Sequence, residues 1–153
     1  MALEFSTAGI KVKVGYETTA GSKPATFATE IPDIVSISEI NDEPNMLDVT
    51  NLSDLVWTRQ IPGLRSSSGA LSVTVNGTQD FKNKWTTMCT SASTAYASGK
   101  ATWFEITVPG YSSAYFITGI PSELGFFGAD VDEVYRGDVY IAKNTIEGWA
   151  AIV

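Results

Sequence analysis

The sequence predicts a mainly β protein: a β sandwich or barrel of two packed antiparallel sheets with one flanking α-helix and a long β-hairpin-like loop. Val, Ile and Thr together number 41 against 7 Leu, and β-branched residues favour strands. Several segments also alternate apolar and polar residues with the two-residue period of a half-buried strand. Only one segment has helical spacing. The 153 residues suit a single domain over residues 1–153.

The clearest predicted strands in the first half of the chain are residues 9–17 and 70–76. In the first of these, apolar residues alternate with lysine and glycine, and in the second they alternate with serine and threonine. Residues 18–29 have no period and contain turn-forming residues, so they predict an irregular connection.

A further strand is predicted over residues 33–41, and its two faces are both mixed. One face carries Val35, Ile37 and Glu39, and the other carries two isoleucines and two serines: Ile34, Ser36, Ser38 and Ile40. Such a strand either exposes part of each face to solvent or lines a polar space.

Residues 42–68 form a long segment without a clear period. Residues 46–50 have the composition to pair briefly as a strand. The segment holds more apolar side chains than a disordered region carries, namely Met46, Leu52, Leu55, Trp57, Ile61 and Leu64. A loop of this length inside a small domain is usually functional if it is not disordered. We therefore expect an assembly loop that buries its apolar surface on another subunit.

One helix is predicted over residues 79–96. Thr78 is a suitable N-cap, and Ser98 and Gly99 end the helix. One stripe at helical spacing predicts its buried face: Phe81, Trp85, Met88, Cys89, Ala92 and Tyr96.

Four strands are predicted after the helix. They cover residues 101–109, 114–121, 132–143 and 146–152, and Asn144 separates the last two. An order of strands, one helix and more strands favours a β sandwich or barrel with a single helix packed on it.

Charge and composition exclude several functional classes. Ten basic and 17 acidic residues give a net charge of −7, which argues against tight binding of nucleic acid or of an anionic membrane. The absence of histidine removes the common catalytic triads and histidine-ligated zinc. Cys89, the only cysteine, has no histidine partner and lies on the apolar stripe of the predicted helix, so we expect a buried structural thiol rather than a nucleophile. No signal peptide or membrane span is expected, so synthesis is expected in the cytoplasm.

Acidic residues cluster over residues 30–54 and 123–138. A glycosidase pair of carboxylates and a calcium loop at residues 130–133 are possible interpretations, but the spacing of an EF-hand is missing, and a solvated acidic surface is favoured. The tryptophans suggest a sugar-binding platform as an alternative. No catalytic set, metal site or cofactor is predicted, and the chain is not expected to be an enzyme.

Several segments together resemble the major tail tube proteins of long-tailed phages. Residues 43–54 and 58–64 are similar to the long-loop signature of that family, and residues 69–75 and 81–92 are similar to its strand and helix. Residues 119–125 and 130–141 resemble its closing strands, in which an acidic turn precedes a Gly-Asp-Val-x-Ile strand. The resemblance extends over residues 9–145, and the order and spacing of the motifs make it more specific than any one of them.

The resemblance implies a structural protein of the virion tail. Hexameric rings would join their sheets into an inner barrel and stack into a tube, the conduit for genome delivery, and the long loop would reach an adjacent subunit or ring. The partners would be further copies of the chain and other tail proteins (tape measure, tail tip and terminator), with DNA only in transit. The expected subunit-interface residues are Met46, Leu47, Asp48, Leu52, Leu55, Trp57, Arg59 and Ile61.

A conduit for DNA also predicts an acidic and hydroxyl-rich channel wall. Duplex DNA carries a charge about every 1.7 Å of its axis, so a wall of the same sign would repel it and let it slide. The candidates for the channel wall are Ser36, Ser38, Glu39, Asp132, Glu133 and Asp138. The competing hypotheses are a ring-forming tube component of a bacterial contractile or secretion apparatus, a carbohydrate-binding β sandwich and, more remotely, an enzyme that uses paired carboxylates.

Overall fold

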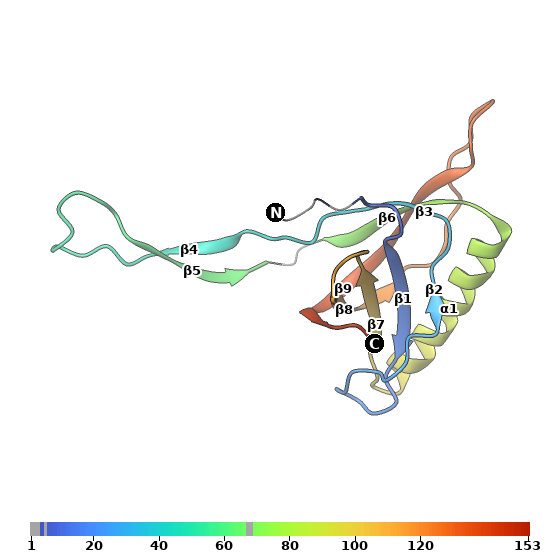
Figure 1. The fold of residues 1–153 in the computed structure, drawn as a ribbon, viewed down its shortest axis with the longest axis horizontal. Coiled ribbons are helices and arrows are strands. Elements are labelled where there is room, and N and C mark those ends of the chain that lie inside the picture. The colour runs from blue at the N-terminus through green and yellow to red at the C-terminus, as the bar shows by residue number, and fades with distance from the viewer. Residues whose placement is uncertain (1–3, 5, 67–68) are drawn as a thin grey trace.

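The computed structural model describes residues 4, 6–66 and 69–153. They form a curled seven-stranded sheet, a separate two-stranded hairpin and one helix (Figure 1). The elements in chain order are β1 (Lys11–Tyr16), β2 (Thr29–Glu30), β3 (Ile34–Ile37), β4 (Pro44–Asp48), β5 (Gln60–Arg65), β6 (Ala70–Asn76), α1 (Gln79–Ala97), β7 (Thr102–Thr107), β8 (Ser113–Pro121) and β9 (Arg136–Ala151). The mainly β fold with a single flanking helix is therefore confirmed.

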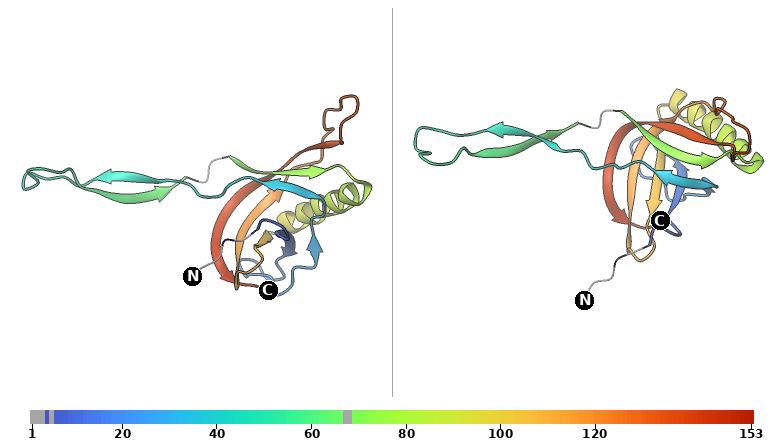
Figure 2. Two further views of the ribbon diagram at one scale, coloured as in Figure 1. Left: turned by 45° about the horizontal axis from the view of Figure 1, so that its top comes forward. Right: turned by 90° about the horizontal axis from the view of Figure 1, so that it is seen from above.

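The large sheet has the strand order β2-β1-β7-β8-β9-β6-β3, and each neighbouring pair is antiparallel. The sheet curls strongly, and α1 lies across one side of it (Figure 2). Alternate residues of the strands and the apolar stripe of α1 share one core. Val12, Leu71 and Phe104 from the sheet and Phe81 and Trp85 from the helix are all buried in it.

A second, smaller cluster lies on the other face of the sheet. Phe27, from the irregular connection before β2, packs with Trp103 and Phe116. A Cβ atom on Gly15 would lie 2.8 Å from the Phe27 ring, so glycine is needed beneath this aromatic side chain. The Nε1–H of Trp103 donates to Glu17 at 2.9 Å, which gives the buried indole its hydrogen bond.

The helix begins and ends as the sequence predicts. The Thr78 hydroxyl accepts the N–H of Phe81 at 3.2 Å, which is an N-cap. Gly99 has a φ of +74° directly after the helix, a conformation that glycine adopts without strain. The expected burial of Tyr96 is wrong: its side chain is exposed near the last turn, beyond the edge of the core.

Strand β9 corrects the prediction of two strands separated at Asn144. The pairing with β8 continues from Ser113↔Ala151 to Pro121↔Ile141, so one strand runs through Asn144. The register shifts twice along it, and at one of these shifts Asn144 is the extra residue of a β-bulge. Thr145 N–H donates to the Thr118 hydroxyl at 3.1 Å, which holds the two strands together at this bulge. The start of the strand is also later than predicted, because residues 132–135 belong to the preceding loop.

Strand β3 is shorter than predicted, and its faces differ from those read from a regular alternation. The register with β6 jumps between Ile34 and Ser36, so Val35 is an extra, exposed residue. Ile34 and Ile37 can therefore both pack against the main core, because a bulge moves the following residue to the opposite face.

Candidate subunit interface

The β4–β5 hairpin forms an arm that stands clear of the rest of the molecule (Figure 1). Leu47 pairs with Ile61 and Asp48 pairs with Gln60 in an antiparallel register. The segment predicted as a long β-hairpin-like loop over residues 42–68 is thus largely a hairpin, and its residues 67–68 lie outside the described residues. A two-stranded hairpin alone is marginally stable in water, so its order depends on further hydrogen bonds.

Hydrogen bonds order the tip of the arm, residues 49–59. Val49 N–H donates to the Arg59 carbonyl at 2.9 Å, and Arg59 N–H donates to the Thr50 hydroxyl at 2.9 Å. Asn51 forms the inner turn: its N–H donates to an Asp54 carboxylate oxygen at 2.9 Å, and its carbonyl accepts the N–H of Asp54 at 3.0 Å. These bonds give the tip a defined shape without contact with the body.

Charged side chains of the arm contribute to the same order. The Arg59 guanidinium donates to Asp54 at 2.9 Å, so the two charges neutralise each other within the tip. The N–H of Thr50 donates to Asp48 at 2.9 Å, and hydrogen bonds from Thr50 hold the pKa of Asp48 below its ordinary value. Asp48 and Arg59, both expected at the interface, thus shape the arm that carries it.

The tip leaves its large apolar side chains in water. Leu52 is 100% exposed, Leu55 is 89% exposed, and Val56 and Trp57 are each 81% exposed. Met46, Leu47 and Ile61 lie along the arm and are about half-exposed. Large exposed apolar surfaces often mark interaction sites, so the arm is the candidate for one. The residues expected at the interface all lie on this arm. Val56, which was not among them, lies on the same exposed tip.

The residues expected to line a channel lie in three places. Ser36, Thr74 and Asp138 form one row across β3, β6 and β9, and all point away from the main core. Ser38 continues this face and accepts the N–H of Ser72 at 3.0 Å. Glu39 instead lies beyond the end of β3, at the base of the arm.

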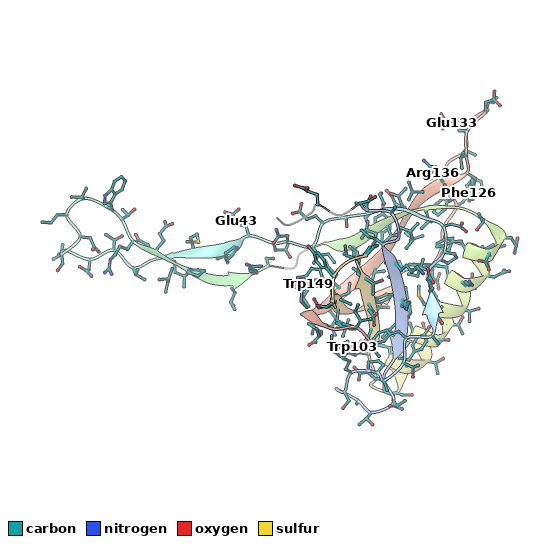
Figure 3. The ribbon with its side chains drawn as sticks, in the orientation of Figure 1. Glu43, Trp103, Phe126, Glu133, Arg136 and Trp149 are labelled. Carbon is teal, nitrogen blue, oxygen red and sulfur yellow. The ribbon has the colours of Figure 1, made fainter. Side chains whose placement is uncertain are left out.

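Asp132 and Glu133 lie on the loop between β8 and β9, which projects from the body (Figure 3). Asp132 has a φ of +64°, which places it in a tight turn. In the described ranges, no group of three or more His, Cys, Asp or Glu side chains is placed to hold a metal ion. The same ranges contain no helix with the length and apolarity needed to cross a bilayer.

The four tryptophans do not form one surface. Trp85 and Trp103 are buried, and Trp57 is at the tip of the arm. Trp149 lies against Tyr111 and Tyr115, with ring centroids 5.4 and 5.3 Å away, and stays half-exposed. Cys89 is half-buried against the main core, and this burial, with the carboxylate of Glu123, raises its thiol pKa.

Two comparisons with known proteins return no match: no family model matches the sequence, and no curated protein matches it. The resemblance to tail tube proteins over residues 9–145 therefore stays an expectation from its motifs. The structure adds to those motifs an ordered arm with an apolar tip, which is a feature of surfaces that bind other proteins.

Proposed function

We propose that this chain is a structural protein that polymerises, through its β4–β5 arm, as stacked hexameric rings into a phage tail tube that conducts the genome. In this proposal it acts as a building block and not as an enzyme, and its partners are other copies and the tape measure, tail tip and terminator proteins. It resides in the virion tail after synthesis in the host cytoplasm.

The single observation that carries the proposal is the ordered tip of the arm with its solvent-exposed apolar side chains. Leu52, Leu55 and Trp57 are held in water at the end of an arm that is far from the protein's own core. Such side chains anchor protein interfaces, because their burial removes a large apolar area from water. The sequence motifs of residues 43–64 support a subunit contact as the purpose of this arm.

The edges of the large sheet support assembly into rings. The described sheet ends in β2 on one side and β3 on the other, and neither edge strand is longer than four residues. Unpaired backbone groups at a sheet edge can bind a strand of another chain. Pairing of edges around a ring would remove both edges of every subunit.

Imaging of the purified protein tests the proposal directly. Over a concentration series, negative-stain electron microscopy beside size-exclusion chromatography is expected to show hollow rings or tubes that increase with concentration. A protein that stays monomeric at every concentration would contradict self-polymerisation. A monomer whose tryptophan fluorescence changes with glycans would instead favour carbohydrate binding, for which the half-exposed Trp149 beside Tyr111 and Tyr115 is the relevant surface.

A channel wall formed by the face of β3, β6 and β9 predicts a specific effect of added positive charge. With Ser36, Ser38 and Asp138 all replaced by lysine, tubes are expected to form while genome ejection slows, because cations on the wall attract the DNA phosphates. The measurement is the ejection time of phage particles that carry the variant.

The matched control places the same change in charge on the exposed side of α1. Replacing Gln79, Asp80 and Thr90 with lysine adds equal positive charge outside the proposed wall. Ejection that slows equally in both variants, or in neither, would refute this placement of the wall. A tube component of a contractile or secretion apparatus would share the assembly but would give no ejection phenotype.

A further inference from the structure

A groove of about 770 Å³ opens at one end of the curled sheet. Its lining includes Ile37 at the end of β3, Ile40 in the segment after it, Ile106 from β7, and Ile146 and Trp149 from β9. This volume lies within the range of sites that hold a buried ligand, roughly 300–1,000 Å³. The groove adjoins the base of the arm at Arg65 and the polar face of β3, β6 and β9 at Ser38.

The floor of the groove is the edge of the main core. Ile37, Ile40 and Ile106 pack against that core without being fully buried. Tyr115 also lines the groove, and its pKa is raised, first by burial and then by the carboxylate of Asp42, against an opposing effect of Arg65. Trp149 at the rim is 54% exposed. The groove thus presents a largely apolar floor that is favourable to cover, and Ser38, Glu39, Asn41 and Arg65 form its polar lining.

The arm tip has the properties that this groove requires of an occupant. It presents leucine, valine and tryptophan side chains on a loop that is already ordered by hydrogen bonds, so binding loses little conformational entropy. Its two charges, Asp54 and Arg59, are paired with each other, so no unpaired charge from this pair enters an apolar site.

An arm tip that occupies this groove must come from a second copy of the chain. The groove lies at the base of the arm, because Asn41 and Arg65 also line it, whereas the tip lies at the far end of the arm (Figure 1). The paired strands β4 and β5 hold the tip away from the groove of the same chain. A contact between different patches on two copies is heterologous, so it repeats into a ring or filament.

We propose that the arm tip of one copy docks in this groove of the next copy. Leu55 and Trp57 then lie against Ile146 and Trp149 of the receiving copy. The inference rests on the proposed function, because it names the partner surface of the same arm, but it can fail independently: copies can assemble through the tip and still place it elsewhere.

Photo-crosslinking of the full-length chain tests where the tip docks. Trp57 is replaced by benzoylphenylalanine, another aromatic residue, and isotopically labelled and unlabelled copies are mixed, assembled and irradiated. The expected adducts join position 57 of one copy to residues 37–41, 106, 115 or 146–149 of another. Adducts elsewhere, or within one copy, overturn the proposed docking position. If microscopy of the same sample shows tubes, the proposed function survives that result; if it shows none, both fail.

A matched pair of isoleucines gives an independent measurement. Ile146 and Ile120 lie on neighbouring strands and are 37% and 42% exposed, but only Ile146 lines this groove. Ile146→Glu is expected to raise the concentration needed for polymerisation by about tenfold or more, as for a central interface residue. Ile120→Glu is expected to leave that concentration nearly unchanged. Equal effects of the two substitutions overturn the proposal.

Discussion

Replacing residues 45–62 by two glycines is expected to yield a folded monomer that no longer polymerises. Pro44 and Arg65 are register partners at the base of the arm, so a short turn can close the chain there. The arm strands pack on each other and not on the core clusters, so the midpoint of thermal unfolding should change by only about 2 °C. Analytical ultracentrifugation and calorimetry measure the two properties.

A point substitution refines this expectation. Val56→Asp places a charge at the tip, and Val131→Asp places the same charge on the other projecting loop, where Val131 is 94% exposed against 81% for Val56. We expect the first to prevent polymerisation and the second to permit it, because an unpaired charge is costly in an apolar contact. Polymers that persist after the arm is removed would refute a role of the arm in assembly.

Trp85→Ala is expected to have the largest effect on the stability of the monomer. Trp85 is 1% exposed, its ring stacks on Phe81 at a centroid distance of 5.7 Å, and its Nε1–H donates to the Ser122 carbonyl at 2.9 Å. Truncation leaves a cavity between helix and sheet and should cost about 3–5 kcal/mol of unfolding free energy. The unfolding midpoint should then fall by about 10 °C.

Two control variants separate the contributions at this position. Trp85→Phe keeps an aromatic ring beside Phe81 but loses the hydrogen bond to Ser122 and part of the packed volume, so it should cost about 1–3 kcal/mol. Tyr96→Ala removes an aromatic residue from the same helix at an exposed site, so its effect should stay within about 0.5 kcal/mol. A loss for Trp85→Ala as small as that for Tyr96→Ala would mean that the helix does not close the core.

Local sequence patterns predicted the elements in which one face packs on the core and the other faces solvent. The strand over 70–76 and the capped helix after Thr78 are of this kind, because each has one apolar face and one polar face. The arm shows the limit of such patterns. Pro62 and Gly63 argue against a strand in most sheets, but in a two-stranded hairpin an unpaired outer edge tolerates proline.

The remaining differences arise from tertiary contacts. The bulges at Val35 and Asn144 change which side chains face the core, and the pairing with β6 and β8 determines where they occur. Glu105 is another example: its side chain is buried in the sheet, and its carboxylate oxygens have no hydrogen-bond partner among the described residues. The groove could not be predicted either, because its lining comes from segments spread over more than a hundred residues.

The arm contributes no residue to either cluster of buried residues, so substitutions in it are separated from the packing of the core. Substitutions at exposed positions away from core packing usually change stability by less than about 0.5 kcal/mol. Here, substitutions at residues 49–59 leave the determinants of folding almost untouched. In the proposed function, the affinity and partner preference of the tip can therefore be varied, by natural drift or by engineering, on a scaffold whose stability changes little.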